Sequence, residues 1–126
     1  MVCRPDGVTD FDKLRAAVGR LGSRDAFLYA FDLLEIDGEN MRPYEWHVRR
    51  ATLRSLIKRA GAGILLSEHI DSGGHGAAMF AHACRMGLEG IVAKRRDRPY
   101  RSGRSPDWIK VKNPDAPAAS RITRNW

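Results

Sequence analysis

Two short apolar runs separated by a basic, turn-rich segment constrain this chain more than any other feature. The runs are Ile91–Ala93 and Trp108–Val111, and each is rich in β-branched or aromatic residues and bounded by Gly, Pro, Asp or Asn. Such runs favour strands over helix. The segment between them contains Pro99, Gly103 and Pro106, which favour a loop. The sequence therefore predicts two strands joined by a long basic connection.

The second of these strands carries two lysines on one face. Lys110 and Lys112 are two residues apart, whereas Ile109 and Val111 point to the opposite face. Two ammonium groups side by side repel each other, and a bound polyanion such as a phosphate relieves the repulsion. Glu89, at the start of the first strand, is a candidate ligand for Mg²⁺, which accompanies nucleotide phosphates. A solvated basic hairpin without a ligand is the alternative that spacing alone leaves open.

The charge balance indicates an anionic partner. The net charge is +7, from 22 lysines and arginines against 15 aspartates and glutamates. Basic residues crowd into Arg95–Arg104, which makes nucleic acid the first expectation. A second basic cluster lies in a predicted helix, and a solvated polar face is its default interpretation. Its members are Arg49, Arg50, Arg54, Lys58 and Arg59.

Length and cysteine content exclude several classes of protein. The 126 residues suffice for one modest domain with its own core. No apolar run is long enough to span a membrane, and the N-terminus lacks the apolar core of a signal peptide. Cys3 and Cys84 lack metal-ligand spacing, so we expect reduced thiols. His75 and His82 are seven residues apart, and we expect them on the surface rather than at a metal site.

The rest of the chain alternates between strand and helix patterns. Residues 26–34 form the clearest strand, and because both of its faces are largely apolar we expect it to be central in a sheet. The pair Asp37-Gly38 closes it with a turn. The remaining expected elements are helices over 11–18, 44–60 and 75–86 and a short strand over 64–68.

Four segments resemble the nucleotidyltransferase motifs of ATP-dependent DNA ligases. Residues 89–94, Glu-Gly-Ile-Val-Ala-Lys, resemble motif IV, and residues 108–112, Trp-Ile-Lys-Val-Lys, resemble motif V. Residues 28–34, Leu-Tyr-Ala-Phe-Asp-Leu-Leu, resemble motif IIIa. Residues 100–105, Tyr-Arg-Ser-Gly-Arg-Ser, resemble the connecting loop of bacterial members, especially end-joining ligase domains. The resemblance spans nearly the whole chain.

This resemblance implies an α+β fold. We expect residues 1–114 to form the C-terminal part of a nucleotidyltransferase (ATP-grasp-like adenylation) domain, with antiparallel sheets packed with helices around a nucleotide cleft. Residues 115–126 read as a mobile tail because two prolines and few apolar residues occur near the end of the chain. The implied activity is nick sealing, in which a lysine takes AMP from ATP, AMP passes to the 5′-phosphate of DNA, and the 3′-hydroxyl displaces it.

The resemblance also implies roles for individual residues. Phe31 is expected to stack on the adenine of ATP or AMP. Glu89 is expected to bind Mg²⁺ or Mn²⁺ and to help position the nucleotide. Lys110 and Lys112 are expected to bind the α-phosphate and stabilise its developing charge, and Lys94 is a further candidate contact to the nucleotide.

DNA contacts are expected from the basic loop. By the same resemblance, Arg101 and Arg104 contact DNA phosphates, and the substrate is nicked or broken double-stranded DNA in the bacterial cytosol or nucleoid. No membrane partner is expected. Two other functions stay open: a non-catalytic nucleic-acid-binding module or remnant, and another covalent nucleotidyltransferase such as an RNA ligase or capping enzyme.

The nucleophile of the family does not occur in the sequence. Its lysine sits in a Lys-x-Asp-Gly setting, which this sequence lacks. Residues 4–7, Arg-Pro-Asp-Gly, offer an arginine instead, and arginine does not lose its proton in proteins. We therefore expect a fragment, whether a truncated reading frame, one piece of a split gene or a remnant, that cannot self-adenylate. A complementary N-terminal ligase fragment or end-joining proteins are the expected partners.

Overall fold

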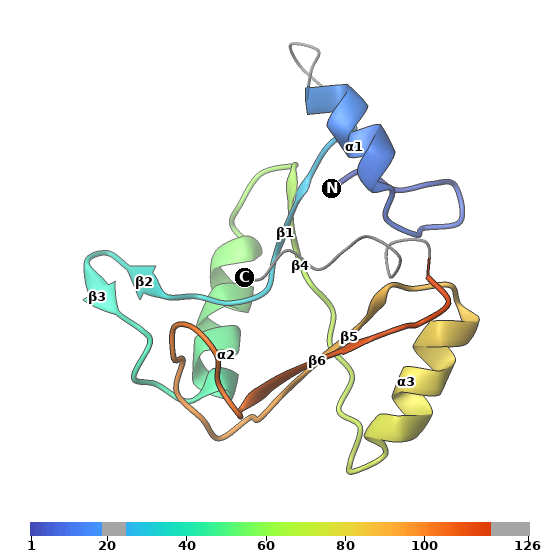
Figure 1. Ribbon diagram of the computed structural model, residues 1–126. Coiled ribbons are helices and arrows are strands. Elements are labelled where there is room, and N and C mark those ends of the chain that lie inside the picture. The colour runs from blue at the N-terminus through green and yellow to red at the C-terminus, as the bar shows by residue number, and fades with distance from the viewer. Residues whose placement is uncertain (19–24, 117–126) are drawn as a thin grey trace.

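The computed structural model describes residues 1–18 and 25–116 (Figure 1). The expected helices over 11–18, 44–60 and 75–86 are confirmed, with ends that differ by a few residues. No helix among the described residues has the length and apolar character needed to cross a membrane. The elements are α1 Phe11–Val18, β1 Leu28–Ala30, β2 Glu35–Ile36, β3 Glu39–Asn40, α2 Trp46–Ile57, β4 Ile64–Leu66, α3 Gly76–Arg85, β5 Gly90–Lys94 and β6 Trp108–Lys112.

The strands β1 and β4 pair in parallel, so the expectation of antiparallel sheets alone is wrong. Their register runs from Leu28 opposite Ile64 to Ala30 opposite Leu66. The helix α2 lies between them in the chain and carries it back to the starting edge, which is the usual connection between parallel strands. The two other strand pairs are antiparallel.

The strand β1 is also shorter and less central than the sequence predicted. It has three residues rather than nine, it has one partner among the described strands, and Leu28 is 61% exposed. Residues 31–34 leave the ladder because Asp32 pairs with Arg49 of α2 instead of lying against another strand. A charged side chain thus overrides the apolar pattern around it.

Two tight turns follow the sequence closely. Asp37 and Gly38 join β2 to β3 with φ of 50° and 81°, the positive values that a two-residue hairpin turn needs. Gly87 ends α3 with φ of 72°. There the N–H groups of Gly87 and Leu88 donate to the carbonyls of Cys84 and Ala83, which satisfies the last turn of the helix.

The hairpin of β5 and β6 is the longest ladder in the described chain, and it confirms the two predicted strands. It pairs Gly90 with Lys112 at one end and Lys94 with Trp108 at the other. At Gly90 a β-carbon would lie 2.2 Å from the carbonyl oxygen of Val111, so only glycine fits. The helix α3 packs against β5 (Figure 1).

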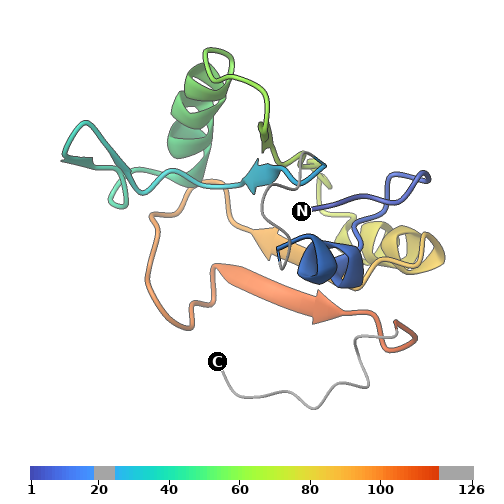
Figure 2. The ribbon, with the colours of Figure 1, turned by 90° about the horizontal axis from the view of Figure 1, so that it is seen from above.

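The connection between β5 and β6 joins the hairpin to α2. The N–H groups of Trp46 and His47, at the start of α2, donate to the carbonyls of Arg98 (2.9 Å) and Arg96 (3.2 Å). Figure 2 shows α2 on one side of the β1–β4 pair and the hairpin on the other. The loop therefore holds two layers of the fold in register.

The buried apolar side chains are few and spread over the chain. Among the described residues they are Val2, Met41, Trp46, Leu53, Ala83 and Ala116. Asp115 and Ala116 bond back to Asn113, so the first two residues of the predicted tail are held in place. The rest of that tail lies outside the described residues.

Candidate nucleotide and nucleic-acid site

One face of the β5–β6 hairpin carries three of the residues that the sequence singled out. Residues paired across an antiparallel ladder share a face, and so do residues two apart along a strand. Lys110 and Lys112 therefore share one face, as their spacing predicted, and Lys94 lies on the same face. Both hairpin lysines are exposed, and their contact with a phosphate stays a prediction. The other members of this face are Gly90, Val92 and Trp108.

Lys94 holds Phe31 against the hairpin. Its ammonium nitrogen lies 4.1 Å from the ring centroid of Trp108 and 4.7 Å from that of Phe31, close enough for cation–π attraction to both rings. We call these three residues the Lys94 clamp. Burial lowers the pKa of Lys94, and the nearby carboxylate of Asp32 opposes that effect.

The clamp brings residues from two distant segments to one place. Phe31 follows β1, whereas Lys94 and Trp108 end and begin the hairpin strands. Phe31 remains 54% exposed, so its ring keeps surface on which a base can stack. The resemblance to motif IIIa predicted this residue, but its contact with Lys94 was not expected from the sequence.

A buried ion pair fixes the backbone beside Phe31. Asp32 and Arg49 form two parallel hydrogen bonds of 2.8 and 3.0 Å, with their side chains 4% and 0% exposed. Arg49 also donates to the carbonyls of Tyr44 (2.7 Å) and Arg98 (3.3 Å). The interpretation of Arg49 as part of a solvated face is therefore wrong. A buried guanidinium needs such partners, because water no longer solvates it.

Sequence reasoning missed this pair, although a signal for it existed. Asp32 stands alone among apolar residues in the segment 27–34, and a buried carboxylate in such a setting requires a cation. Nothing in the sequence says which of the arginines in the helix supplies it. The pair positions Phe31 through the backbone and anchors the carbonyl of Arg98 at the same time.

Glu89 lies at the end of the hairpin opposite to the clamp. Its carbonyl accepts from the N–H of Asn113 (2.7 Å), and the amide of Asn113 donates to the carbonyl of Leu88 (2.9 Å). Asn113 is only 3% exposed, so it fastens the start of β5 to the end of β6. The side chain of Glu89 is exposed.

At this end of the hairpin, Glu89 offers a single carboxylate as a possible metal ligand. The described residues contain no group of three or more potential ligands. Mg²⁺ at nucleotide sites commonly takes one or two carboxylates and completes its shell with phosphates and water. Glu89 fits that pattern as a single ligand. The histidines and cysteines that the sequence placed outside a metal site belong to no such group either.

The basic loop presents its arginines to solvent. Arg101 and Arg104 are exposed, and neither forms an ion pair with the part of the chain that the structure describes. The ring of Tyr100 packs edge-on against Trp108 with centroids 5.6 Å apart. This packing sets the loop beside the clamp. Their contact with DNA stays a prediction.

Comparisons with known proteins match most of the chain to one family. A model of the ATP dependent DNA ligase domain matches residues 7–112. The multifunctional non-homologous end joining protein LigD of Pseudomonas aeruginosa is 34% identical over 118 residues, which cover 89% of this chain and 13% of that protein. A probable DNA ligase of Dictyoglomus turgidum is 39% identical over 88 residues, which cover 68% of this chain and 15% of that protein. The chain thus spans 13–15% of the length of these relatives.

Proposed function

This chain belongs to the ATP-dependent DNA ligase family, and we propose on that premise that it contributes the phosphate-binding face of a nick-sealing site. The observation that carries the proposal is the Lys94 clamp, which sets an exposed aromatic ring beside a strand with two free lysines. A base stacks on the ring while phosphates meet the lysines. Residues 1–114 would then be part of a nucleotidyltransferase adenylation domain.

Each side chain has one task in this proposal. Phe31 stacks on adenine, and Lys110 and Lys112 hold the α-phosphate and stabilise the charge that develops on it. Lys94 contacts the nucleotide at the clamp. Glu89 holds Mg²⁺, or Mn²⁺ in its place, and such an ion neutralises phosphate charge when bound.

DNA is held by the loop. Arg101 and Arg104 contact backbone phosphates of nicked or broken double-stranded DNA, since exposed arginines without an acidic partner suit that role. The name of the Pseudomonas aeruginosa relative refers to non-homologous end joining. We extend that setting, DNA end joining in the bacterial cytosol, to this chain as part of the proposal.

The chain alone is proposed to catalyse only the last step of sealing. It has no Lys-x-Asp-Gly segment to accept AMP from ATP. On DNA that already carries AMP, the 3′-hydroxyl oxygen attacks the 5′-phosphate, the bond to AMP breaks, AMP leaves, and the hydroxyl proton passes to water. A ligase fragment that supplies the lysine would complete the earlier steps.

A sealing assay tests this proposal. A nicked duplex with a 5′-adenylate is incubated with the chain and Mg²⁺ without ATP, and the joined strand is measured on a denaturing gel. We expect sealing by the wild-type chain and its loss in Lys110→Ala/Lys112→Ala. The matched control Lys58→Ala/Arg59→Ala removes the same charge from the end of α2 and should seal normally. Equal sealing by both double variants, or none by the folded wild-type chain, would contradict the proposal.

The basic loop also supports a second candidate, a non-catalytic nucleic-acid-binding module. Its arginines are exposed and form no ion pair within the described residues. Such a module would bind DNA with strong salt dependence, would ignore ATP, and would keep its affinity in Glu89→Ala. A DNA affinity that changes with ATP, or that falls in this variant, favours the ligase function instead.

A further inference from the structure

A second group of cations gathers where three segments meet. Arg50 and Arg54 come from α2, His69 follows β4, and Arg96 follows β5. We call these four residues the α2 cation cluster. The sequence grouped Arg50 and Arg54 with other arginines of the helix as a solvated face. In the structure, Arg50 and Arg54 instead group with His69 and Arg96.

Packing holds two members of the cluster, Arg50 and His69, in place. The guanidinium of Arg50 lies 5.6 Å from the ring centroid of Trp46 and donates to the carbonyl of Ser67 at 2.5 Å. The ring of His69 packs edge-on against the same ring of Trp46, with centroids 5.2 Å apart. Cations on a merely solvated face have no such supports. Their ordering here lowers the entropic cost of gripping an anion.

The charges of the cluster are not balanced from within. Burial lowers the pKa of His69, and the positive charges of Arg50, Arg96 and Arg54 lower it further. Burial lowers the pKa of Arg50 as well, and the charge of Arg54 adds to that effect. One acid, Asp71, raises the pKa of His69, and its carboxylate is already 2.6 Å from a guanidinium nitrogen of Arg96. A bound anion would relieve the remaining repulsion.

The start of α2 itself does not offer the anion site. The N–H groups of Trp46 and His47 are occupied by the carbonyls of Arg98 and Arg96. An anion would therefore be bound by the side chains of the α2 cation cluster. Arginine is suited to it, because its fork of donors matches two phosphate oxygens.

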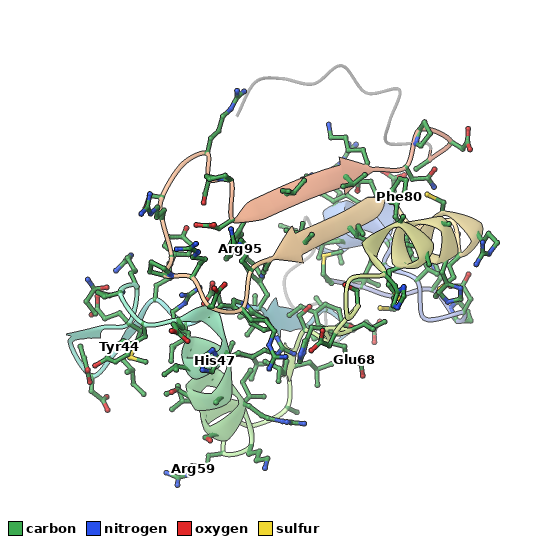
Figure 3. The ribbon with its side chains drawn as sticks, turned by 90° about the horizontal axis from the view of Figure 1, so that it is seen from below. Tyr44, His47, Arg59, Glu68, Phe80 and Arg95 are labelled. Carbon is green, nitrogen blue, oxygen red and sulfur yellow. The ribbon has the colours of Figure 1, made fainter. Side chains whose placement is uncertain are left out.

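The cluster continues from the site already described. The charge of Arg50 acts on Lys94 as well as on His69, so Arg50 is near the clamp as well as near the rest of the cluster. Figure 3 labels His47 at the start of α2 and Arg59 just beyond its other end. Basic groups thus run from the hairpin along α2 as far as Arg54 in its last turn.

We propose that the α2 cation cluster binds the phosphate backbone of duplex DNA and carries the bound duplex from the hairpin onto α2. This inference rests on the proposed function, because it takes DNA as the substrate. The contacts are to phosphate oxygens, so they carry no base sequence information. They position the duplex relative to the lysines of the hairpin.

Fluorescence anisotropy tests the inference. The full chain is titrated against a labelled nicked duplex without ATP, over a range of KCl concentrations. The cluster variant is Arg54→Gln/Arg96→Gln, which spares Arg50 and its packing. The matched control, Lys58→Gln/Arg59→Gln, removes the same charge just beyond the C-terminal end of α2. A further variant, Asp71→Asn, removes the acid beside Arg96, and circular dichroism checks that every variant is folded.

The expected results concern affinity and salt dependence together. The cluster variant should bind severalfold more weakly, and the slope of log K against log salt should fall by about 1.8, because each phosphate contact contributes about 0.9. The control should keep nearly the wild-type slope, and Asp71→Asn should bind more tightly. Equal losses in both double variants, an unchanged slope in the cluster variant, or no DNA binding by the wild-type chain would overturn the inference.

Failure of the cluster is distinguishable from failure of the proposed function. Wild-type affinity in the cluster variant, together with loss of sealing in Lys110→Ala/Lys112→Ala, would refute the cluster and leave the sealing site intact. A cluster-dependent affinity in a chain that seals no adenylated nick would support the cluster and refute the sealing function.

Discussion

Removal of the buried carboxylate of Asp32 should destabilise this fold more than any other single loss of charge. In Asp32→Ala the guanidinium of Arg49, which is 0% exposed, loses two short hydrogen bonds and its only carboxylate partner among the described residues. Breaking a buried ion pair from one side typically costs about 3–5 kcal/mol. Small domains have about 5–15 kcal/mol of stability in total. The variant should therefore lose a large share of its stability.

Urea unfolding followed by circular dichroism measures this effect. The double variant Asp32→Ala/Arg49→Leu removes both charges and should recover much of the loss, because an apolar pair of similar volume often replaces a buried ion pair at little cost. The control Asp97→Ala breaks an exposed pair with Arg95, whose side chains are 65% and 56% exposed. It should change stability far less. A loss in Asp32→Ala no larger than in the control would refute the account of this pair.

Three further predictions follow from single sites. Gly90→Ala places a β-carbon 2.2 Å from the carbonyl oxygen of Val111, so it should destabilise the hairpin by about 1–3 kcal/mol in urea unfolding; an unchanged midpoint would contradict the close approach. Burial and neighbouring arginines lower the pKa of His69. Between that lowered pKa and the ordinary value of about 6.5, the folded chain binds fewer protons than the unfolded chain, so its stability should fall as pH drops through this range. Thermal melts should show a weaker pH dependence in His69→Gln, and an identical dependence would be evidence against it. Phe31→Ala should weaken AMP binding by about 1–3 kcal/mol in calorimetry, whereas Leu28→Ala, which removes another exposed apolar side chain, should not.

Local patterns were enough to predict the elements that position the candidate site. The hairpin strands follow from short β-branched runs bounded by turn residues, and the shared face of Lys110 and Lys112 follows from the two-residue repeat of a strand. The turn at Asp37-Gly38 and the helix end at Gly87 follow from the positive φ that these positions require. Each of these features depends on neighbours in the sequence.

Features that depend on distant partners could not be predicted in this way. Asp32 and Arg49 are buried only because α2 folds back over the segment after β1. The parallel pairing of β1 with β4 has the same origin. The Lys94 clamp requires the segment after β1 to meet the hairpin, and the resemblance to ligase motifs pointed to its members without indicating their contact.

The central claim is that this chain supplies the phosphate-binding face but not the nucleophile, and intact mass spectrometry tests it most directly. The chain is incubated with ATP and Mg²⁺, alone and with a ligase fragment that contains Lys-x-Asp-Gly. We expect no AMP adduct on this chain, and an adduct on the added fragment that disappears when Lys110→Ala/Lys112→Ala replaces the wild type. An AMP adduct on this chain alone, or a fragment adduct that forms equally well without the two lysines, would contradict the account.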